Sequence, residues 1–291
     1  MTLREKLQRG VFTITVELDP PKSSEASKTL QEATRLHGSV DAINIADSPM
    51  ANMRMSPIAL SHIIQIKVGI ETIFHLTCRD RNIIGLQSEL LGAAALGVTN
   101  ILTLTGDDPK RGDHPDATGV FETDSTGLIQ LANTLNQGLD KTGHSLDSPT
   151  HFFIGTAVNP DAKNPKLELE KLKAKIAAGA RFTQTQPIYD IAVAERFMSE
   201  VSDLPIYVLM GILPLKSYKM AQYLHEKVPG INIPAAIMEE MKQGGKEAGI
   251  AIARRTIEKL KHISHGIHIM PLNNIDTVLA LTKKDDTTSS L

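Results

Sequence analysis

Several short apolar runs in this chain end abruptly in polar side chains. Residues 101–104 read Ile-Leu-Thr-Leu and are followed at once by Thr-Gly-Asp-Asp-Pro at 105–109. Other segments that change in the same way are residues 16–20, 44–49, 75–80 and 183–187. Ligands of α/β proteins bind at the carboxyl ends of the strands, where such polar groups gather. The pattern therefore predicts one site surrounded by the ends of several strands.

Glu17 is the first candidate catalytic residue, because it stands at the end of an apolar run. Burial disfavours a charged carboxylate, so a partly buried Glu17 would have a raised pKa and could act as a general acid. The alternatives are a solvated strand end and an ion pair inside a barrel.

Asp107 and Asp108 form the second candidate. Gly106 has no side chain and would let a ligand approach the backbone closely. The alternative is structural, because Gly-Asp-Asp-Pro is also a favourable turn sequence. Gln186 offers an amide that could form two hydrogen bonds with a planar heterocycle. It could equally bond to groups at the rim of the site.

The sequence does not predict a metal site. His262, His265 and His268 are three residues apart, but a change from helix to strand between them would turn the side chains in different directions. The acidic loop at residues 107–116 lacks the spacing of a calcium loop. Cys78 has no evident base partner, so we interpret it as a thiol of the core.

Alternating strand-like and helix-like segments must position these residues. Strands are predicted at residues 12–17, 42–46, 72–76, 100–105, 152–157, 182–185, 206–210 and 268–271. Helices are predicted at residues 24–36, 57–67, 83–96, 125–138, 166–178, 191–201, 216–226, 234–262 and 273–281. This alternation predicts an α/β fold, a closed (β/α)₈ TIM barrel. The alternative is an open doubly wound sheet, but its Gly-rich dinucleotide-binding turn is absent.

The predicted organisation is a single barrel domain over residues 1–282, followed by a polar, disordered tail at 283–291. Two connections are longer than a plain link between strand and helix. Residues 107–124 would lie on the ligand-binding face and could cover a ligand, whereas residues 141–149 would lie on the opposite face.

The composition excludes several classes of protein. The chain has 31 basic and 33 acidic residues, a net charge of −2, no Trp and 4% aromatic residues. Clustered basic and aromatic side chains are therefore lacking, and we expect no nucleic-acid partner. No apolar run approaches the ~18 residues that a membrane helix needs. The single cysteine and the absence of a signal-peptide core favour the cytoplasm.

Several motifs stand in a fixed order between Phe12 and about Asp276. They are Thr-Val-Glu-Leu-Asp-Pro-Pro at 15–21, Phe-His-Leu-Thr-Cys at 74–78, Leu-Thr-Gly-Asp at 104–107, Val-Asn-Pro-Asp-Ala-Lys at 158–163, Thr-Gln at 185–186 and Gly-Ile-Leu-Pro at 211–214. Together they resemble the methylenetetrahydrofolate reductase family of flavin-dependent (β/α)₈ barrels. Residues 112–119 are similar to the branch found in anaerobes and in fusions with homocysteine methyltransferase.

The resemblance implies flavin-dependent reduction of 5,10-methylenetetrahydrofolate to 5-methyltetrahydrofolate, with hydride passing from reduced flavin to an iminium form of the folate. It implies that Glu17 is the general acid and that Asp107 contacts both flavin and pterin. The implied cofactor, FAD, would be contacted by Met55, His75, Thr105, Gly106, Asp107, Ala157, Asn159 and Lys175. The folate would be contacted by Gln186, Tyr218 and Asn274.

The resemblance leaves several points open. Enterobacterial members have Arg at the position of Thr105 and His at that of Asn159, so FMN is an alternative to FAD. The electron donor is expected to be NADH or an electron-donating partner subunit, and the chain is expected to form an oligomer. Two other functions fit part of the pattern: a flavin-free pterin-binding methyltransferase barrel, and a flavin electron-relay subunit of a larger reductase complex.

Overall fold

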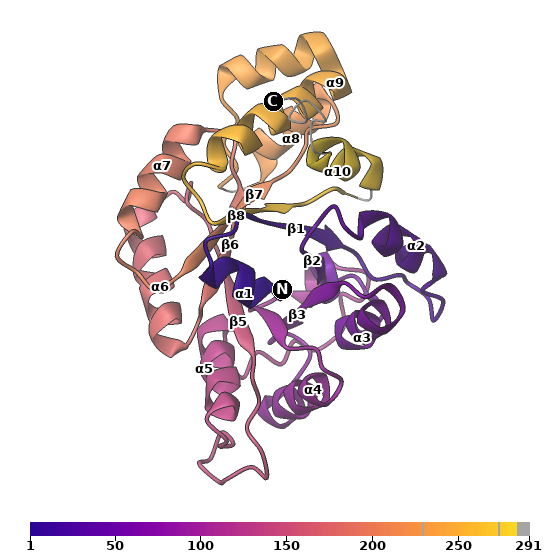
Figure 1. The fold of residues 1–291 in the computed structure, drawn as a ribbon, viewed down its shortest axis with the longest axis vertical. Coiled ribbons are helices and arrows are strands. Elements are labelled where there is room, and N and C mark those ends of the chain that lie inside the picture. The colour runs from indigo at the N-terminus through magenta and orange to yellow at the C-terminus, as the bar shows by residue number, and fades with distance from the viewer. Residues whose placement is uncertain (229, 273, 284–291) are drawn as a thin grey trace, which may run out of the picture.

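Eight parallel strands close into a barrel in the computed structural model, which describes residues 1–228, 230–272 and 274–283 (Figure 1). The strands are β1 (Thr13–Leu18), β2 (Ala42–Ile45), β3 (Glu71–Thr77), β4 (Asn100–Leu104), β5 (Phe153–Val158), β6 (Phe182–Pro187), β7 (Tyr207–Ile212) and β8 (Gly266–Ile269). Strands adjacent in the chain pair with each other, and β8 closes the barrel against β1. The predicted (β/α)₈ barrel is confirmed, and every predicted strand overlaps an observed one.

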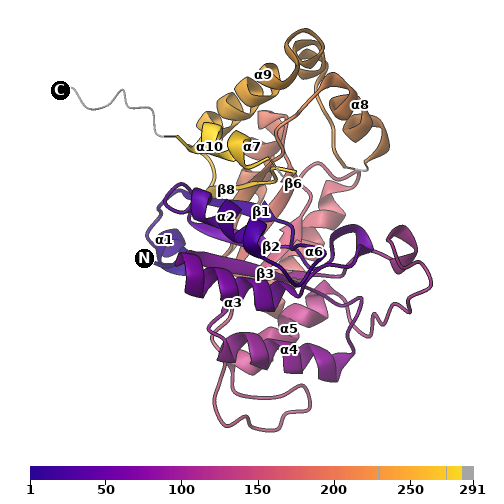
Figure 2. The ribbon, with the colours of Figure 1, turned by 90° about the vertical axis from the view of Figure 1, so that its right-hand side faces the viewer.

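Helices surround the barrel, as Figures 1 and 2 show from two directions. Among the described residues, each of β1 to β6 is followed by one α-helix, β7 by two and β8 by one. The helices are α2 (Ser27–Leu36), α3 (Pro57–Val68), α4 (Ile83–Ala95), α5 (Ser125–Asn136), α6 (Pro165–Ala178), α7 (Ile191–Glu200), α8 (Tyr218–Lys227), α9 (Ala235–Leu260) and α10 (Ile275–Thr282). No described helix is both long and apolar enough to cross a membrane.

The structure differs from the sequence-based prediction at the start of the chain and within the longest predicted helix. A short helix, α1 (Leu3–Gln8), precedes β1, and its first turn is closed by a capping box between Thr2 and Glu5. The predicted helix at residues 234–262 is interrupted at Gly245, where φ is 53° and ψ is −132°. Of the predicted tail, only Lys283 lies within the described residues, where it ends α10.

The amino-terminal end of the barrel is closed by an apolar layer. Leu3 and Leu7 of α1 are almost completely buried. They pack against inward-facing side chains of the strands, which include Ile73, Leu102, Phe153, Phe182 and Leu209. In Figure 1, α1 lies in front of the centre of the barrel. The helix therefore plugs this end, and a ligand can reach the barrel interior only from the other end.

The long connection at residues 107–124 joins β4 to α5 at the carboxyl-terminal end of the barrel. Its Asp113 accepts a hydrogen bond from the backbone N–H of Met53 at 3.0 Å. Gly112 lies so close to Ala51 that a Cβ atom would overlap the Ala51 carbonyl oxygen. The connection is thus fastened to the loop after β2, on the face predicted to bind a ligand.

Candidate active site

Glu17 lies at the open end of the barrel. It is the second-last residue of β1 and stands in register with Asn44 of β2. Its side chain is 30% exposed, so it remains accessible from the barrel mouth. Because the chain direction of β1 places Glu17 beyond the buried layers, a ligand in the mouth could contact its carboxylate.

A buried polar layer lies one step deeper, formed by Thr15, Asn44, His75, Gln184 and His268, each at most 4% exposed. Asn44 and Gln184 form a reciprocal amide pair across the barrel, with N···O distances of 2.8 and 3.0 Å. Asn44 also lies 2.9 Å from Nε2 of His75, and Gln184 donates to the Thr15 hydroxyl at 3.1 Å. Buried polar groups require such partners, so this network fixes the side chains beneath the mouth.

His268 connects the polar layer with Glu17. Its Nδ1 atom lies 3.0 Å from the Thr15 hydroxyl oxygen and 3.3 Å from Nε2 of Gln184. The Gln184 amide directs its two hydrogens to Asn44 and Thr15, so the Thr15 hydroxyl is the donor to Nδ1. A neutral ring that accepts at Nδ1 carries its hydrogen on Nε2. This Nε2 atom lies 3.9 Å from a carboxylate oxygen of Glu17. His268 can therefore direct an N–H group toward the candidate acid.

The pKa of Glu17 is lowered, so the raised value predicted from the sequence is wrong. Burial is the strongest influence and by itself raises the pKa. The nearby N–H of His268, 3.9 Å away, and the positive charges that His75 and His268 carry when protonated act against burial and outweigh it. The prediction was wrong because the two histidines come from β3 and β8, which are distant from Glu17 in the sequence. In this state Glu17 favours its ionised form and needs a proton before it can act as an acid.

Asp19 shows the opposite shift. Burial and the charge of Glu17 raise the pKa of Asp19, while Arg54 acts in the other direction. Two neighbouring carboxylates whose pKa values are pushed apart are typical of acid–base sites. Sequence reasoning missed Asp19 as a candidate, because its burial depends on the closed barrel and Arg54 comes from the connection after β2.

His75 lies in the polar layer in its neutral form. Burial lowers its pKa to about 4, although Glu17 opposes the shift. Its Nε2 atom faces the Asn44 amide at 2.9 Å and accepts from it, so the hydrogen of the ring is on Nδ1. His75 is 4% exposed in the layer beneath the mouth, and its role toward a cofactor stays a prediction.

The two adjacent aspartates that follow β4 have different contacts. Asp108 accepts a hydrogen bond from the backbone N–H of Lys110 at 2.9 Å and caps a 3₁₀ turn, so its role is structural. Asp107 is exposed and makes no side-chain hydrogen bond or ion pair with the described part of the chain. Gly106 has a φ of 95°, and a Cβ atom there would lie 3.0 Å from two neighbouring side chains. Only glycine meets both conditions, and Asp107 is left free to contact a ligand.

Two predicted cofactor residues make structural hydrogen bonds. The hydroxyl of Thr105 accepts from the first backbone N–H of α5 at 3.2 Å. Asn159 donates to the carbonyl of Gly230 at 3.2 Å and so connects β5 with the chain after α8. Lys175, a third predicted cofactor residue, donates from its Nζ to the carbonyl of Ala157 at 2.8 Å, at the end of β5. Burial lowers the pKa of Lys175, although Glu168 opposes the shift.

The remaining predicted residues are spread around the mouth. Gln186 is the exposed residue of β6, and Tyr218 is 37% exposed at the start of α8. Met55 is partly buried and packs against the main apolar core. Asn274 caps α10 by accepting from the backbone N–H of Thr277 at 3.3 Å. Gln186 and Tyr218 are therefore free for a ligand, whereas the contacts of Asn274 are those of a helix cap.

A buried ion-pair cluster links the ends of β2 and β3. Asp47, which is 5% exposed, accepts from Arg81 at 2.8 Å and from the Thr77 backbone N–H at 2.9 Å. Arg79, which is 3% exposed, donates to the carbonyl of Ser48 at 3.2 Å. The sequence shows that both strand ends are polar, but their pairing depends on the closed barrel. The cluster therefore fixes the ends of β2 and β3 beneath the long connection.

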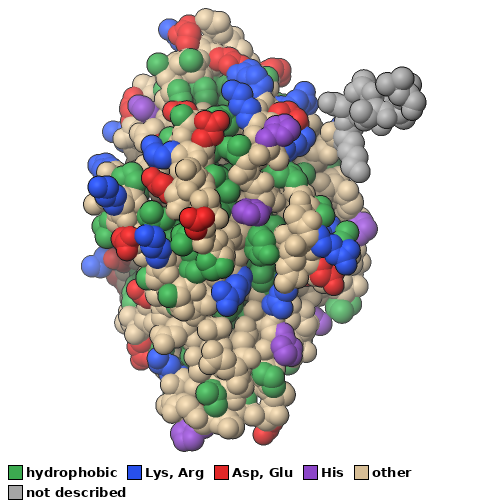
Figure 3. Space-filling view, turned by 60° about the vertical axis from the view of Figure 1, so that its left-hand side comes forward, with side chains coloured by type: hydrophobic (Ala, Val, Ile, Leu, Met, Phe, Trp, Pro, Cys, Tyr) green, Lys and Arg blue, Asp and Glu red, His purple; other side chains and the backbone are tan. Residues whose placement is uncertain are grey.

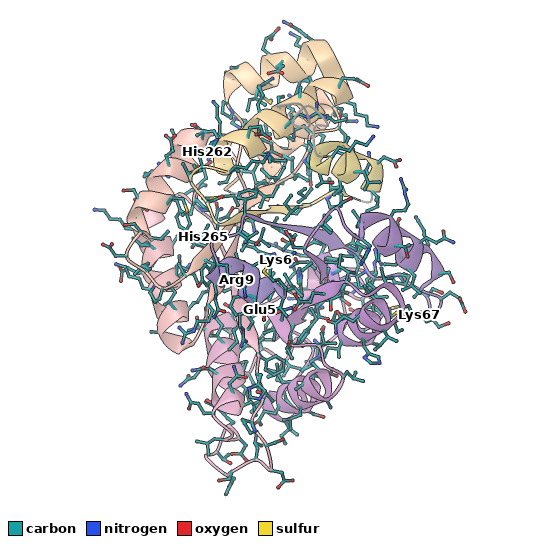
Figure 4. The ribbon with its side chains drawn as sticks, viewed as in Figure 1. Glu5, Lys6, Arg9, Lys67, His262 and His265 are labelled. Carbon is teal, nitrogen blue, oxygen red and sulfur yellow. The ribbon has the colours of Figure 1, made fainter. Side chains whose placement is uncertain are left out.

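Cys78 and the spaced histidines do not form a reactive group. Cys78 is fully buried, and burial raises its pKa to about 12, as expected for a thiol of the core. His262 is exposed, and Nδ1 of His265 accepts from the Val208 backbone N–H at 3.1 Å (Figure 4). Within the described ranges, no three His, Cys, Asp or Glu residues are grouped as metal ligands.

The groups at the mouth fit a flavin. A flavin ring is flat and carries both donors and acceptors along its edge. The mouth offers a free carboxylate at Asp107, a free amide at Gln186 and an ammonium group at Lys175. Gly106 removes the side chain that would otherwise keep a flat ring from the end of β4. The donor set is therefore suited to such a cofactor.

Known proteins resemble this chain in sequence and in structure. A methylenetetrahydrofolate reductase of *Escherichia coli* is 25% identical over 235 residues, which is 78% of this chain and 72% of that protein. A probable methylenetetrahydrofolate reductase (NADPH) of *Caenorhabditis elegans* is 25% identical over 231 residues, which is 74% of this chain and 32% of that protein. Methylenetetrahydrofolate reductase 2 of *Saccharomyces cerevisiae* is 33% identical over 163 residues, and 25% of its length is covered. The chain thus spans a third or less of these two eukaryotic relatives.

A similar solved structure is that of an uncharacterized protein from *Clostridium thermocellum* that binds two copies of 5-methyl-5,6,7,8-tetrahydrofolic acid. The TM-score is 0.66, with 15% identity and coverage of 97% of both chains. At this identity, the likeness supports the barrel fold alone. A family model described as methylenetetrahydrofolate reductase matches residues 2–285. The chain therefore belongs to the methylenetetrahydrofolate reductase family.

Proposed function

We propose that this barrel reduces 5,10-methylenetetrahydrofolate to 5-methyltetrahydrofolate with a flavin bound at its mouth. The observation that carries the proposal is the position of Glu17, accessible at the mouth and 3.9 Å from the N–H-bearing nitrogen of His268. A reaction that must protonate a substrate nitrogen needs an acid in this place. Membership of the family supplies the substrate class.

A bound reduced flavin would supply the hydride. Glu17 would deliver a proton to N10 of the folate, which opens the five-membered ring and leaves a reactive iminium at N5. Asp107 would accept hydrogen bonds from the pterin and lie close to the cofactor. Gln186 would orient the pterin through its amide. The buried polar layer would hold His268 in the orientation that faces Glu17.

Glu17 must gain its proton when the ligands are in place. Its side chain is 30% exposed, and a ligand covering the mouth would remove this remaining contact with water. Loss of solvent disfavours the ionised carboxylate and therefore raises its pKa. Asp19, whose pKa is already raised, is the nearest candidate for storing a proton beside it. We thus expect substrate binding to convert Glu17 into a general acid.

Membership of the family supports the substrate assignment, and a Clostridium thermocellum protein of the same fold binds 5-methyl-5,6,7,8-tetrahydrofolic acid. For the cofactor, we propose FAD with FMN as the alternative. Lys175, at the rim of the mouth, is the group that we expect to meet a flavin phosphate. The roles of Met55, His75, Thr105, Ala157, Asn159 and Asn274 toward cofactor and folate stay predictions.

The electron donor is either NADH or a partner subunit. Direct use of NADH requires space for a nicotinamide over the flavin, and Tyr218 is the exposed aromatic side chain predicted to be near it. The chain's single cysteine cannot hold an iron–sulfur cluster of the usual four-thiolate kind, so such a cluster would belong to a partner. An oligomeric state and a place in the cytoplasm also stay predictions.

The test is to identify the chromophore released from the purified protein and to assay folate turnover on the same sample. We expect a flavin spectrum and oxidation of 5-methyltetrahydrofolate coupled to an artificial dye. A colourless protein that binds the folate would favour the flavin-free methyltransferase barrel. A flavin that is reduced by a dye but never by the folate would favour an electron-relay subunit.

A further inference from the structure

A cleft of about 620 Å³ lies at the amino-terminal end of the barrel, opposite the mouth. Its walls come from α1, from the end of α5 and from residues that precede or begin β5 to β8. The volume falls within the roughly 300–1,000 Å³ that small-molecule sites occupy. Figure 4 shows His265, which lines the cleft, beside α1 in a view onto this end of the barrel. The cleft has no part in the chemistry proposed for the mouth.

The charged side chains that line this cleft are basic. Arg4 and Arg181 both line it, whereas no Asp or Glu does. Arg4 donates to the carbonyl of His151 at 3.0 Å and stacks over Phe153, with 5.1 Å from the guanidinium carbon to the ring centre. Among the described residues, neither arginine lies within 4.0 Å of a carboxylate. Two guanidinium groups without a counter-charge would attract an oxyanion.

Aromatic rings form another wall of the cleft. Tyr207 and His265 pack edge to face, with ring centres 5.3 Å apart and planes at 85°. Nδ1 of His265 accepts from the Val208 backbone N–H, so the neutral ring has a donor on Nε2. Such a wall suits a flat ring that carries hydrogen-bonding groups. Figure 3, turned toward one side of this end, shows hydrophobic side chains near the centre of the face with Lys or Arg side chains beside them.

We propose that this cleft binds a small organic anion, an oxyanion carried on a flat ring. Arg4 and Arg181 would bind the oxyanion, and the ring would pack against Tyr207 and His265. The oxyanion could be a phosphate, as in a nucleotide, or a carboxylate, as in an aromatic acid. Because α1 and the apolar layer beneath it separate this cleft from the mouth, this ligand would be bound separately from the folate.

The experiment is calorimetric titration of the intact protein with three probes. AMP carries a phosphate on a flat ring, 4-aminobenzoylglutamate carries carboxylates on a flat ring, and adenosine is the neutral control. We expect one of the two anions to bind and adenosine to bind much more weakly. The anion that binds identifies the kind of oxyanion. Absence of binding by both anions up to millimolar concentration would overturn the proposal.

Variants separate this cleft from the mouth. Arg181→Gln changes an exposed side chain and is expected to weaken the anion by roughly tenfold or more, because a charge-assisted hydrogen bond is lost. Arg9→Gln is the matched control, since Arg9 is exposed on the same end of the molecule but does not line the cleft (Figure 4). Equal binding by wild type, Arg181→Gln and Arg4→Gln would contradict the proposed site. Folate turnover should be unchanged by Arg181→Gln.

Discussion

At the level of single residues, the proposed reaction depends on how the protein controls the proton of Glu17. The carboxylate is accessible, its pKa is lowered, and the N–H of His268 faces it at 3.9 Å. These features favour an ionised Glu17 in the absence of ligand. Its predicted role requires the neutral form, so the proton must be taken up as ligands cover the mouth. Glu17 is therefore the residue whose substitution is most informative.

We predict that Glu17→Gln abolishes folate reduction while flavin binding and reduction by an artificial donor persist. An amide cannot deliver the proton, and loss of a general acid costs about 10²–10⁴-fold in rate. Steady-state turnover and dye reduction are measured on the same sample, with Glu25→Gln, an exposed carboxylate of the connection after β1, as the control. Near-normal turnover in Glu17→Gln combined with loss in Asp19→Asn would assign the acid to Asp19 instead.

We predict that Asp107→Asn slows folate turnover and also changes the reduction of the flavin. Asp107 is free of protein partners among the described residues and is expected to contact both ligands, so both half-reactions should respond. Asp108→Asn is the matched control, because Asn is also a good cap for the turn that Asp108 closes. If Asp107→Asn alters only the melting temperature, Asp107 is a structural turn residue.

At the scale of elements, the barrel combines an apolar layer, a polar layer and a ring of strand ends. The strands could be predicted from their apolar runs, and the barrel from the regular alternation with helices. Helix α1 could not be predicted, because its six residues are too few to show a periodic pattern. The polar layer could not be predicted either, because Asn44 and Gln184 meet only after the whole barrel has closed. The same reason explains the wrong pKa direction for Glu17.

The polar layer should make the stability of the barrel depend on pH. The pKa of His75 is about 4 in the folded protein against an ordinary 6.5, so the unfolded chain binds more protons between these values. Stability is therefore full above about pH 6.5 and falls as the pH decreases toward 4, by ~3 kcal/mol in total.

Melting curves across this range test the prediction. His75→Gln, which keeps an acceptor for Asn44, should flatten the decline in melting temperature between pH 6.5 and pH 4. His37→Gln is the control, since His37 is exposed at the end of α2. Identical slopes for wild type and His75→Gln would mean that the buried histidine does not govern acid sensitivity.

At the scale of the whole molecule, the question is where the electrons come from. The chain covers 32% of its *C. elegans* relative and 72% of its *E. coli* relative, so longer members contain further segments. It has no Trp and 4 Tyr, which limits the surfaces on which an adenine or nicotinamide can stack. Thr105 and Asn159, predicted near the cofactor, are engaged in structural hydrogen bonds. These features favour a partner-delivered route.

We therefore expect NADH to reduce the flavin of the isolated chain slowly, relative to reduction by 5-methyltetrahydrofolate. Stopped-flow mixing with each reductant under anaerobic conditions gives both rates from the same absorbance band. Rapid bleaching by NADH would reject the partner-delivered route and assign NADH as the direct donor. The result bears on the donor alone, because the folate half-reaction is measured separately.

Anaerobic mixing of the flavin-loaded protein with 5-methyltetrahydrofolate shows whether the barrel mouth brings folate and flavin together beside Glu17. We expect the wild-type flavin to be bleached within the time of catalytic turnover, with 5,10-methylenetetrahydrofolate formed in equal amount. We expect no bleaching on this timescale in Glu17→Gln, although a chemical reductant still bleaches that variant. An unchanged flavin spectrum in the wild type, with the folate demonstrably bound, would mean that the mouth does not bring the two together.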